Sequence, residues 1–177
     1  MIIREQRNEQ DYVCDIEVFM FTKLLGEYLL VFGNLELALE NTIEIMINKI
    51  VQGREIELRK ITRFLLKGQS VSKKLNVLKF LILYLESKTQ AEWLNFIQNV
   101  QYLSEIRNIL AHGMYGEESD NLLKLSYDNN GELKETSMSI EKLNELLNQL
   151  GERYRQLFDS VIEPLELYIC EHPKLEI

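Results

Sequence analysis

Residues 89–113 of the chain read TQAEWLNFIQNVQYLSEIRNILAHG. The segment opens with Thr89 and has Glu92 three residues later, which is the capping-box pattern at the start of a helix. Apolar residues then recur every three or four positions as far as Leu110, as they do on one face of a helix. Gly113 follows, and glycine commonly stands just beyond a helix end in a left-handed conformation. The sequence therefore predicts one long helix that stops at Gly113.

The last turns of this predicted helix carry Arg107, Asn108 and His112. Ser104, Asn108 and His112 are spaced by four and lie on one face, while Arg107 lies about 100° from Asn108 and roughly 140° from His112. Arginine and histidine can therefore meet only in a cleft that reaches around the helix end or that another subunit completes. A histidine before a glycine is also compatible with a purely structural helix terminus. Asparagine, however, is a poor helix former, so Asn108 indicates a hydrogen-bonding role.

Helical spacing of apolar residues recurs in most of the chain. The predicted helices span residues 15–51, 55–66, 70–87, 89–113 and 139–158. Gly53 is expected to end the first of them, Ser70 or Ser72 to cap the third, and Ser139 to start the last. Gly26 and Gly33 leave open whether the first is one long helix or two helices end to end. Residues 122–127 and 132–137 flank the turn DNNG and predict a β-hairpin. We therefore expect an all-α bundle of about five helices in a single domain, residues 1–177, with a small β-hairpin before the last helix.

The composition is that of a soluble globular protein, with 177 residues, 46% hydrophobic and 27% charged. Cys14 and Cys170 have no metal-ligand spacing and are expected to be reduced thiols. The N-terminus lacks the apolar core of a signal peptide. The longest apolar runs, around residues 29–32 and 77–85, are too short or too interrupted to span a bilayer. We expect a cytoplasmic protein that does not bind a membrane.

Charge is distributed unevenly along the chain. The net charge of −8 argues against a general nucleic-acid coat protein. Residues 53–88, however, carry a net charge of +6 within a chain that is otherwise −14. These basic residues are compatible with a phosphate-attracting surface, although such runs more commonly form a solvated helix face.

Residues 107–113, Arg-Asn-Ile-Leu-Ala-His-Gly, resemble the Arg-Asn-x-x-x-His form of the Arg-x4-6-His motif of HEPN domains (higher eukaryotes and prokaryotes nucleotide-binding). The long first helix with residues 32–36 (FGNLE), the motif at the end of a later helix, and the trailing hairpin and helix are similar to bacterial members. The resemblance covers most of the chain as organisation and seven residues as motif. It implies a HEPN-like helical bundle that pairs as a homodimer, with both motifs facing one cleft.

Catalytically active members of this family are metal-independent endoribonucleases, so the resemblance implies RNA as the substrate and no metal or cofactor. His112 is then the acid–base group, Arg107 stabilises the charged phosphate, and Asn108 orients the phosphate, the ribose or the partner motif. These roles suit the residue types, because histidine titrates near neutral pH and the arginine fork matches phosphate oxygens. A toxin or anti-phage effector controlled by a separate antitoxin is the biological role that follows.

Three further residues are candidates for substrate binding. Ser104 shares the helix face of Asn108. Tyr115 follows the motif directly, where it could stack on a base. Glu36 could face the motif together with Glu40, although two carboxylates four residues apart more commonly form a solvated pair.

Some toxin members carry a tyrosine two residues after the histidine, which a partner nucleotidyltransferase modifies. Met114 occupies that position here and Tyr115 comes one residue later, so control by a nucleotidyltransferase antitoxin stays an open expectation. Many domains of the family also bind nucleotides or proteins without cleaving RNA, and the acidic C-terminal third suits a protein-binding surface. A non-catalytic HEPN binding module is therefore the alternative, followed by a purely structural helical dimer.

Overall fold

The computed structural model describes residues 9–50, 61–62, 64–84, 90–119, 122–129 and 131–159. Its elements are the helices α1 (Glu9–Ile50), α3 (Val71–Tyr84), α4 (Gln90–His112) and α5 (Ile140–Leu157) and the strands β1 (Met114–Ser119), β2 (Leu122–Asn129) and β3 (Glu132–Ser139). Residues 61–62 and 64–66 are also helical. The fold is mostly helical with a small antiparallel sheet between α4 and α5, as the apolar spacing predicted.

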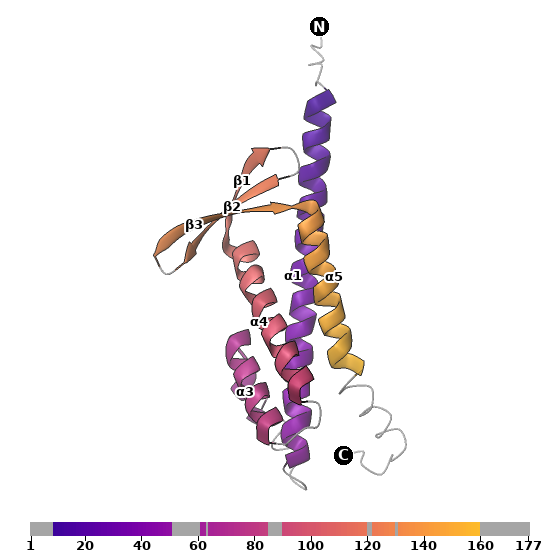
Figure 1. The fold of residues 1–177 in the computed structure, drawn as a ribbon, viewed down its shortest axis with the longest axis vertical. Helices are drawn as coiled ribbons and strands as arrows, with labels where there is room; N and C mark the ends of the chain where they lie inside the picture. Colours follow the sequence, from indigo (N-terminus) through magenta and orange to yellow (C-terminus); the bar gives the residue numbers. More distant parts are fainter. Residues whose placement is uncertain are drawn as a thin grey trace.

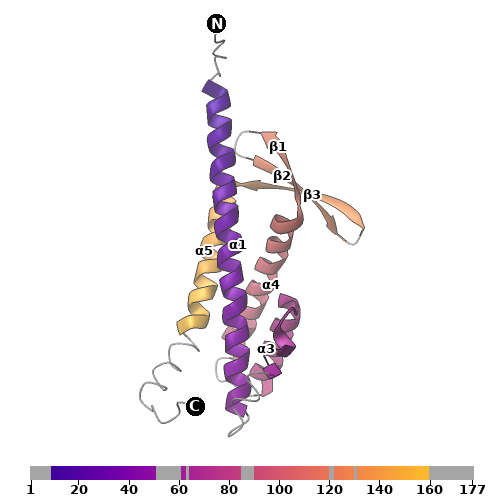
Figure 2. The same cartoon turned by 180° about the vertical axis from the view of Figure 1, so that it is seen from behind.

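The first helix organises the molecule. α1 is continuous over 42 residues, so neither Gly26 nor Gly33 breaks it. α4 and α5 lie beside α1, α3 lies beside α4, and the sheet projects near the N-terminal half of α1 (Figure 1; Figure 2). The termination of α1 at Gly53 and the cap at Thr89, both predicted, fall outside the described residues.

The core follows the predicted helical spacing. Its largest buried side chains include Tyr28, Phe32, Leu35, Leu39 and Ile43 of α1, Phe96 and Leu103 of α4, and Leu125 of β2. The hydroxyl of Tyr28 donates a hydrogen bond to the backbone oxygen of Leu103 over 3.0 Å. This bond satisfies the polar end of a fully buried ring and ties α1 to α4.

Replacing Tyr28 with phenylalanine is expected to lower the free energy of unfolding at pH 7 by about 1 kcal/mol, the usual net worth of one hydrogen bond. Burial, with a smaller contribution from Tyr102, raises the pKa of Tyr28 above its ordinary value. The folded chain therefore holds this proton more tightly than the unfolded chain, whose tyrosine pKa is about 10. The stabilisation is complete below that pKa and is lost as the pH rises through and above it.

Urea denaturation of wild type and Tyr28→Phe over pH 7 to about 11 measures both effects. The difference in the free energy of unfolding between the two proteins is expected to narrow above pH 10, because only the wild type has a phenol at position 28 that becomes free to ionise on unfolding. A gap that is independent of pH contradicts the linkage between burial of Tyr28 and stability.

Glycines and serines mark the element ends. Gly68 has φ of 76° and follows the helical residues 64–66. Ser70 precedes α3 and accepts a hydrogen bond from the Lys73 amide at 3.4 Å, so Ser70 and not Ser72 begins this helix. Ser139 caps α5 as predicted, accepting from the Lys142 amide at 3.1 Å.

The sheet contains the predicted hairpin and one strand more. β2 pairs antiparallel to β3, and the turn between them has Gly131 at φ 87° with its amide donating to the Asp128 carboxylate. β1 pairs antiparallel to β2 on the other side, with Met114 opposite Ser126. The prediction of only two strands is wrong, because MYGEES lacks alternating apolar residues and contains a glycine, both weak signals for a strand.

By length and composition alone, the part of α1 from Val18 to Asn48 could cross a membrane. The expectation that every apolar run is too short to span a bilayer is wrong for this helix. Apolar residues lie on two of its faces, so the mean hydropathy is high along one continuous helix. One face packs into the bundle core through residues such as Leu35 and Leu39. The other is exposed and carries Phe19, Leu30 and Leu37.

Candidate functional site

The three motif residues lie in the last two turns of α4. His112 is the final residue of this helix, and Gly113 still donates its amide to the Ile109 oxygen at 2.8 Å. The expected left-handed conformation of Gly113 is wrong, since Gly68 and Gly131 are the glycines with positive φ in the described part of the chain. Glycine is needed for a different reason. A Cβ at this position would lie 2.6 Å from the Ile109 oxygen.

Gly113→Ala is therefore expected to destabilise the fold by about 1–3 kcal/mol, because the contacting atom is a backbone oxygen that cannot rotate away. The junction between α4 and β1 has to shift, and His112 shifts with it. Gly116→Ala is the matched control, since a Cβ there meets nothing within 4 Å. Equal urea midpoints for the two variants would show that Gly113 is not sterically required.

Arg107 is half-buried and held against α1. Its Nη1 donates to Oδ1 of Asn108 at 3.1 Å, and its guanidinium carbon lies 6.0 Å from the ring centroid of Phe32. Phe32 is itself buried, so the cation rests on the aromatic core of the bundle. Two neighbours thus restrict the guanidinium, and one of them is the second residue of the motif.

Exposure increases along the predicted stripe toward the end of α4. Ser104 is buried, at 8% exposed, whereas Asn108 and His112 are both exposed. The exposed part of this stripe therefore lies at the C-terminal end of α4, whereas the Ser104 side chain is packed inside the bundle. Within the described residues, no hydrogen bond joins Arg107 to His112.

Tyr115 connects the beginning of β1 to both neighbouring helices. Its hydroxyl donates to the backbone oxygen of Leu110, and its ring meets Phe21 edge-on with 6.1 Å between centroids. Burial raises the pKa of Tyr115. The hydroxyl is thus engaged in the fold, while part of the ring stays exposed next to the motif.

The spacing of Glu36 and Glu40 suggested a pair of carboxylates in water, but both contact a buried lysine of α3 instead. Nζ of Lys74 lies 2.5 Å from a carboxylate oxygen of each, and the Lys74 side chain is only 3% exposed. Burial disfavours the lysine cation, but its hydrogen bonds to the two carboxylates outweigh burial and raise the pKa of Lys74. Glu36 therefore links α1 to α3, and its carboxylate is already paired with Lys74, so a part in substrate binding stays a prediction.

Sequence reasoning missed Lys74, although a signal for it was present. Lys74 falls among Val71, Leu75 and Leu78 on the apolar face of α3, where a charge requires a partner.

Comparisons with known proteins assign no family, since no family model, curated protein or solved structure matches the chain.

Proposed function

We propose that the protein is a metal-independent endoribonuclease of HEPN type whose site forms where the ends of two α4 helices face each other in a homodimer. The observation that carries the proposal is the arrangement at the end of α4. Arg107 is restrained by Asn108 and Phe32, and His112 lies exposed within two turns of them. A fixed cation beside an accessible imidazole is what phosphodiester cleavage through an internal nucleophile requires.

In the proposed reaction, one His112 removes the proton from a ribose 2′-hydroxyl, and the resulting oxygen attacks the adjacent phosphorus. The bond from phosphorus to the 5′-oxygen breaks, and the second His112 of the dimer protonates the leaving oxygen. Arg107 stabilises the charge that develops on the phosphate, and Asn108 positions the arginine. The products are a 2′,3′-cyclic phosphate and a 5′-hydroxyl, so protons and charge balance without a metal.

The helix geometry supports the need for two chains. Arg107 and His112 lie roughly 140° apart around α4, so one helix directs them to different sides. A second α4 placed against the first can bring His112 of one chain toward Arg107 of the other. Two histidines then meet in one cleft, one for each proton transfer.

The proposal also assigns the protein to the cytoplasm, where RNA is available. It treats α1 as a core helix, which agrees with the buried residues along it, such as Tyr28, Leu35 and Ile43. As a toxin or anti-phage effector, such a ribonuclease requires a separate protein that silences it.

The test is incubation of end-labelled single-stranded RNAs of varied sequence with the protein in EDTA. Cleavage that leaves a 2′,3′-cyclic phosphate is expected, and a substrate with 2′-deoxyribose at the cleaved position is expected to resist. Absence of cleavage in every RNA, together with saturable nucleotide binding by calorimetry that survives His112→Ala, would instead identify a non-catalytic binding module. The net charge of −8 is the feature that favours this second candidate.

A further inference from the structure

The outward face of α3 is apolar and exposed. Val77, Phe80 and Tyr84 follow one another at helical spacing, with Leu83 beside them, and all four are exposed. The rings of Phe80 and Tyr84 stack with 6.3 Å between their centroids. Scattered apolar residues on a surface need no explanation, but a contiguous apolar face usually marks an interaction site.

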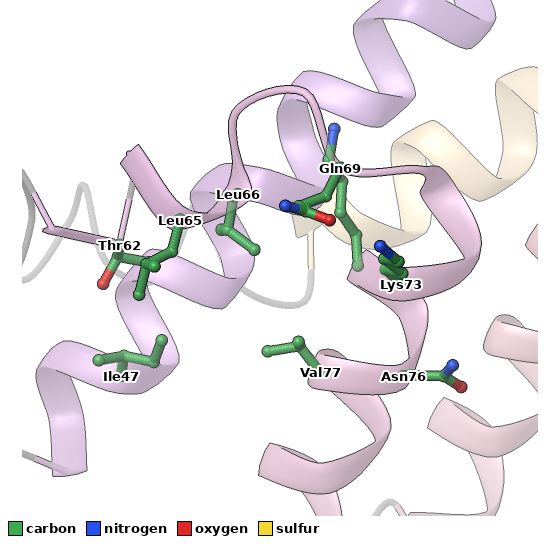
Figure 3. Close-up of a pocket in the computed structure, with 9 residues that line it drawn as sticks. Ile47, Thr62, Leu65, Leu66, Gln69, Lys73, Asn76 and Val77 are labelled. Carbon is green, nitrogen blue, oxygen red and sulfur yellow. The ribbon is translucent and has the colours of Figure 1, made fainter.

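This face borders a cavity of about 420 Å³ between α3, α1 and the helical residues 61–62 and 64–66 (Figure 3). Figure 3 shows Ile47, Leu66 and Val77 facing the same space from three elements. Leu65 also lines the cavity, and the adjacent Phe64 is highly exposed. The cavity and the apolar residues around it are called the α3 groove below.

Among the described residues of the segment 64–84, which forms one side of the α3 groove, every charged side chain is a lysine. Residues 64–84 contain four lysines and no acidic residue, in a chain of net charge −8. Lys74 points inward to its two carboxylates, but Lys67, Lys73 and Lys79 are exposed, and no ion pair between described residues involves them. The groove is therefore an apolar surface with the exposed Lys73 in its lining and with Lys67 and Lys79 on the same segment of the chain.

We propose that the α3 groove binds an amphipathic helix of a partner protein, with apolar residues in the cavity and acidic residues against the lysines. The exposed stripe from Lys73 to Tyr84 is about 16 Å long, which is three turns of a helix. Amphipathic helices bind such grooves through apolar residues at spacings of three, four and seven. The cations select a partner of negative charge.

The shape of the groove favours a helix over other anionic partners. Apolar side chains of a helix can enter the cavity lined by Leu66 and Val77, whereas a lipid surface is flat and leaves it empty. Bases of RNA can stack on Phe80, but they do not cover the exposed aliphatic residues Leu65 and Leu83. Helix α5 of a second copy is also unsuitable, because it carries as many basic as acidic residues and its leucines are mostly buried in its own core.

The experiment uses the full chain with ¹³C-labelled methyl groups and two designed helical peptides of about 18 residues, long enough to form a helix in solution. Both peptides carry leucines at helical spacing, and their flanks carry either glutamate or lysine. The glutamate peptide is expected to shift the methyl resonances of Leu65 and Val77 and to bind at least about tenfold tighter than the lysine peptide. Its affinity is expected to fall with added salt.

Val77→Ser and Phe80→Ser are each expected to weaken this binding about tenfold or more. Phe19→Ser is the matched control, because Phe19 on α1 is 68% exposed and Phe80 is 66% exposed. No binding, equal affinity for both peptides, or loss of binding in Phe19→Ser overturns the proposal. The proposal is also overturned if the acidic peptide fails to bind while single-stranded RNA binds and the groove variants abolish that binding. The same holds for vesicles of equal parts phosphatidylserine and phosphatidylcholine. None of these outcomes depends on RNA cleavage.

Discussion

Replacing His112 with alanine is expected to lower the rate of RNA cleavage by about 10²- to 10⁴-fold, which is the usual contribution of a positioned acid–base group. His112 is exposed at the end of α4, so its loss removes few packing contacts. The free energy of unfolding is therefore expected to change by less than about 0.5 kcal/mol. Single-turnover cleavage in EDTA and urea denaturation measure the two quantities separately.

His172→Ala provides the matched control, because the chain contains only two histidines. It is expected to keep wild-type activity. Arg107→Lys is expected to lower the rate of RNA cleavage by about 10²- to 10³-fold, since an ammonium keeps the charge but lacks the planar fork for phosphate. Cleavage by His112→Ala at the wild-type rate would remove the imidazole from the mechanism.

Replacing Lys74 with methionine is expected to lower the free energy of unfolding by about 3 kcal/mol, the lower end of the range for breaking a buried ion pair. The lysine is almost fully buried between Glu36 and Glu40, at 2.5 Å from each. Without it, two carboxylates one helix turn apart lose their shared counter-ion. Both are partly exposed, so water offsets some of the loss.

Lys73→Met is the matched control, because it makes the same substitution on an exposed side chain one residue earlier. It is expected to change the free energy of unfolding by less than about 0.5 kcal/mol. Combining Lys74→Met with Glu36→Gln and Glu40→Gln removes the repulsion and is expected to restore part of the stability. A Lys74→Met variant as stable as wild type would contradict the role of this cluster in joining α1 to α3.

The helices and the hairpin could be predicted because their signals are local. Apolar spacing places α4 and α5, and Gly131 in the turn places the hairpin. β1 could not be found in this way, because its pairing depends on β2 and its own six residues carry little preference for a strand. The long α1 was predicted as helix, but only its packing shows which of its two apolar faces is buried.

The candidate site was predicted in position but not in its contacts. The sequence correctly predicted that Arg107, Asn108 and His112 lie at a helix end. Spacing could not reveal that Ser104 is buried, that Glu36 is held by Lys74, or that Arg107 rests on Phe32, because each depends on another element. The helix end at Gly113 was predicted correctly but for the wrong reason. Glycine is required there because a Cβ would collide with the backbone oxygen of Ile109, and not because φ is positive.

Mixed dimers test most directly whether two chains share one site. Dimers of Arg107→Ala alone and of His112→Ala alone are each expected to be nearly inactive. A mixture in which the subunits exchange is expected to cleave RNA in EDTA faster than either parent, because its cleft holds one His112 and, from the other chain, one Arg107. Its rate is expected to stay well below that of wild type, because one of the two proton transfers lacks its histidine. Mixed dimers that form, as shown by native mass spectrometry, yet stay as inactive as both parents would contradict a cleft shared between two α4 helices.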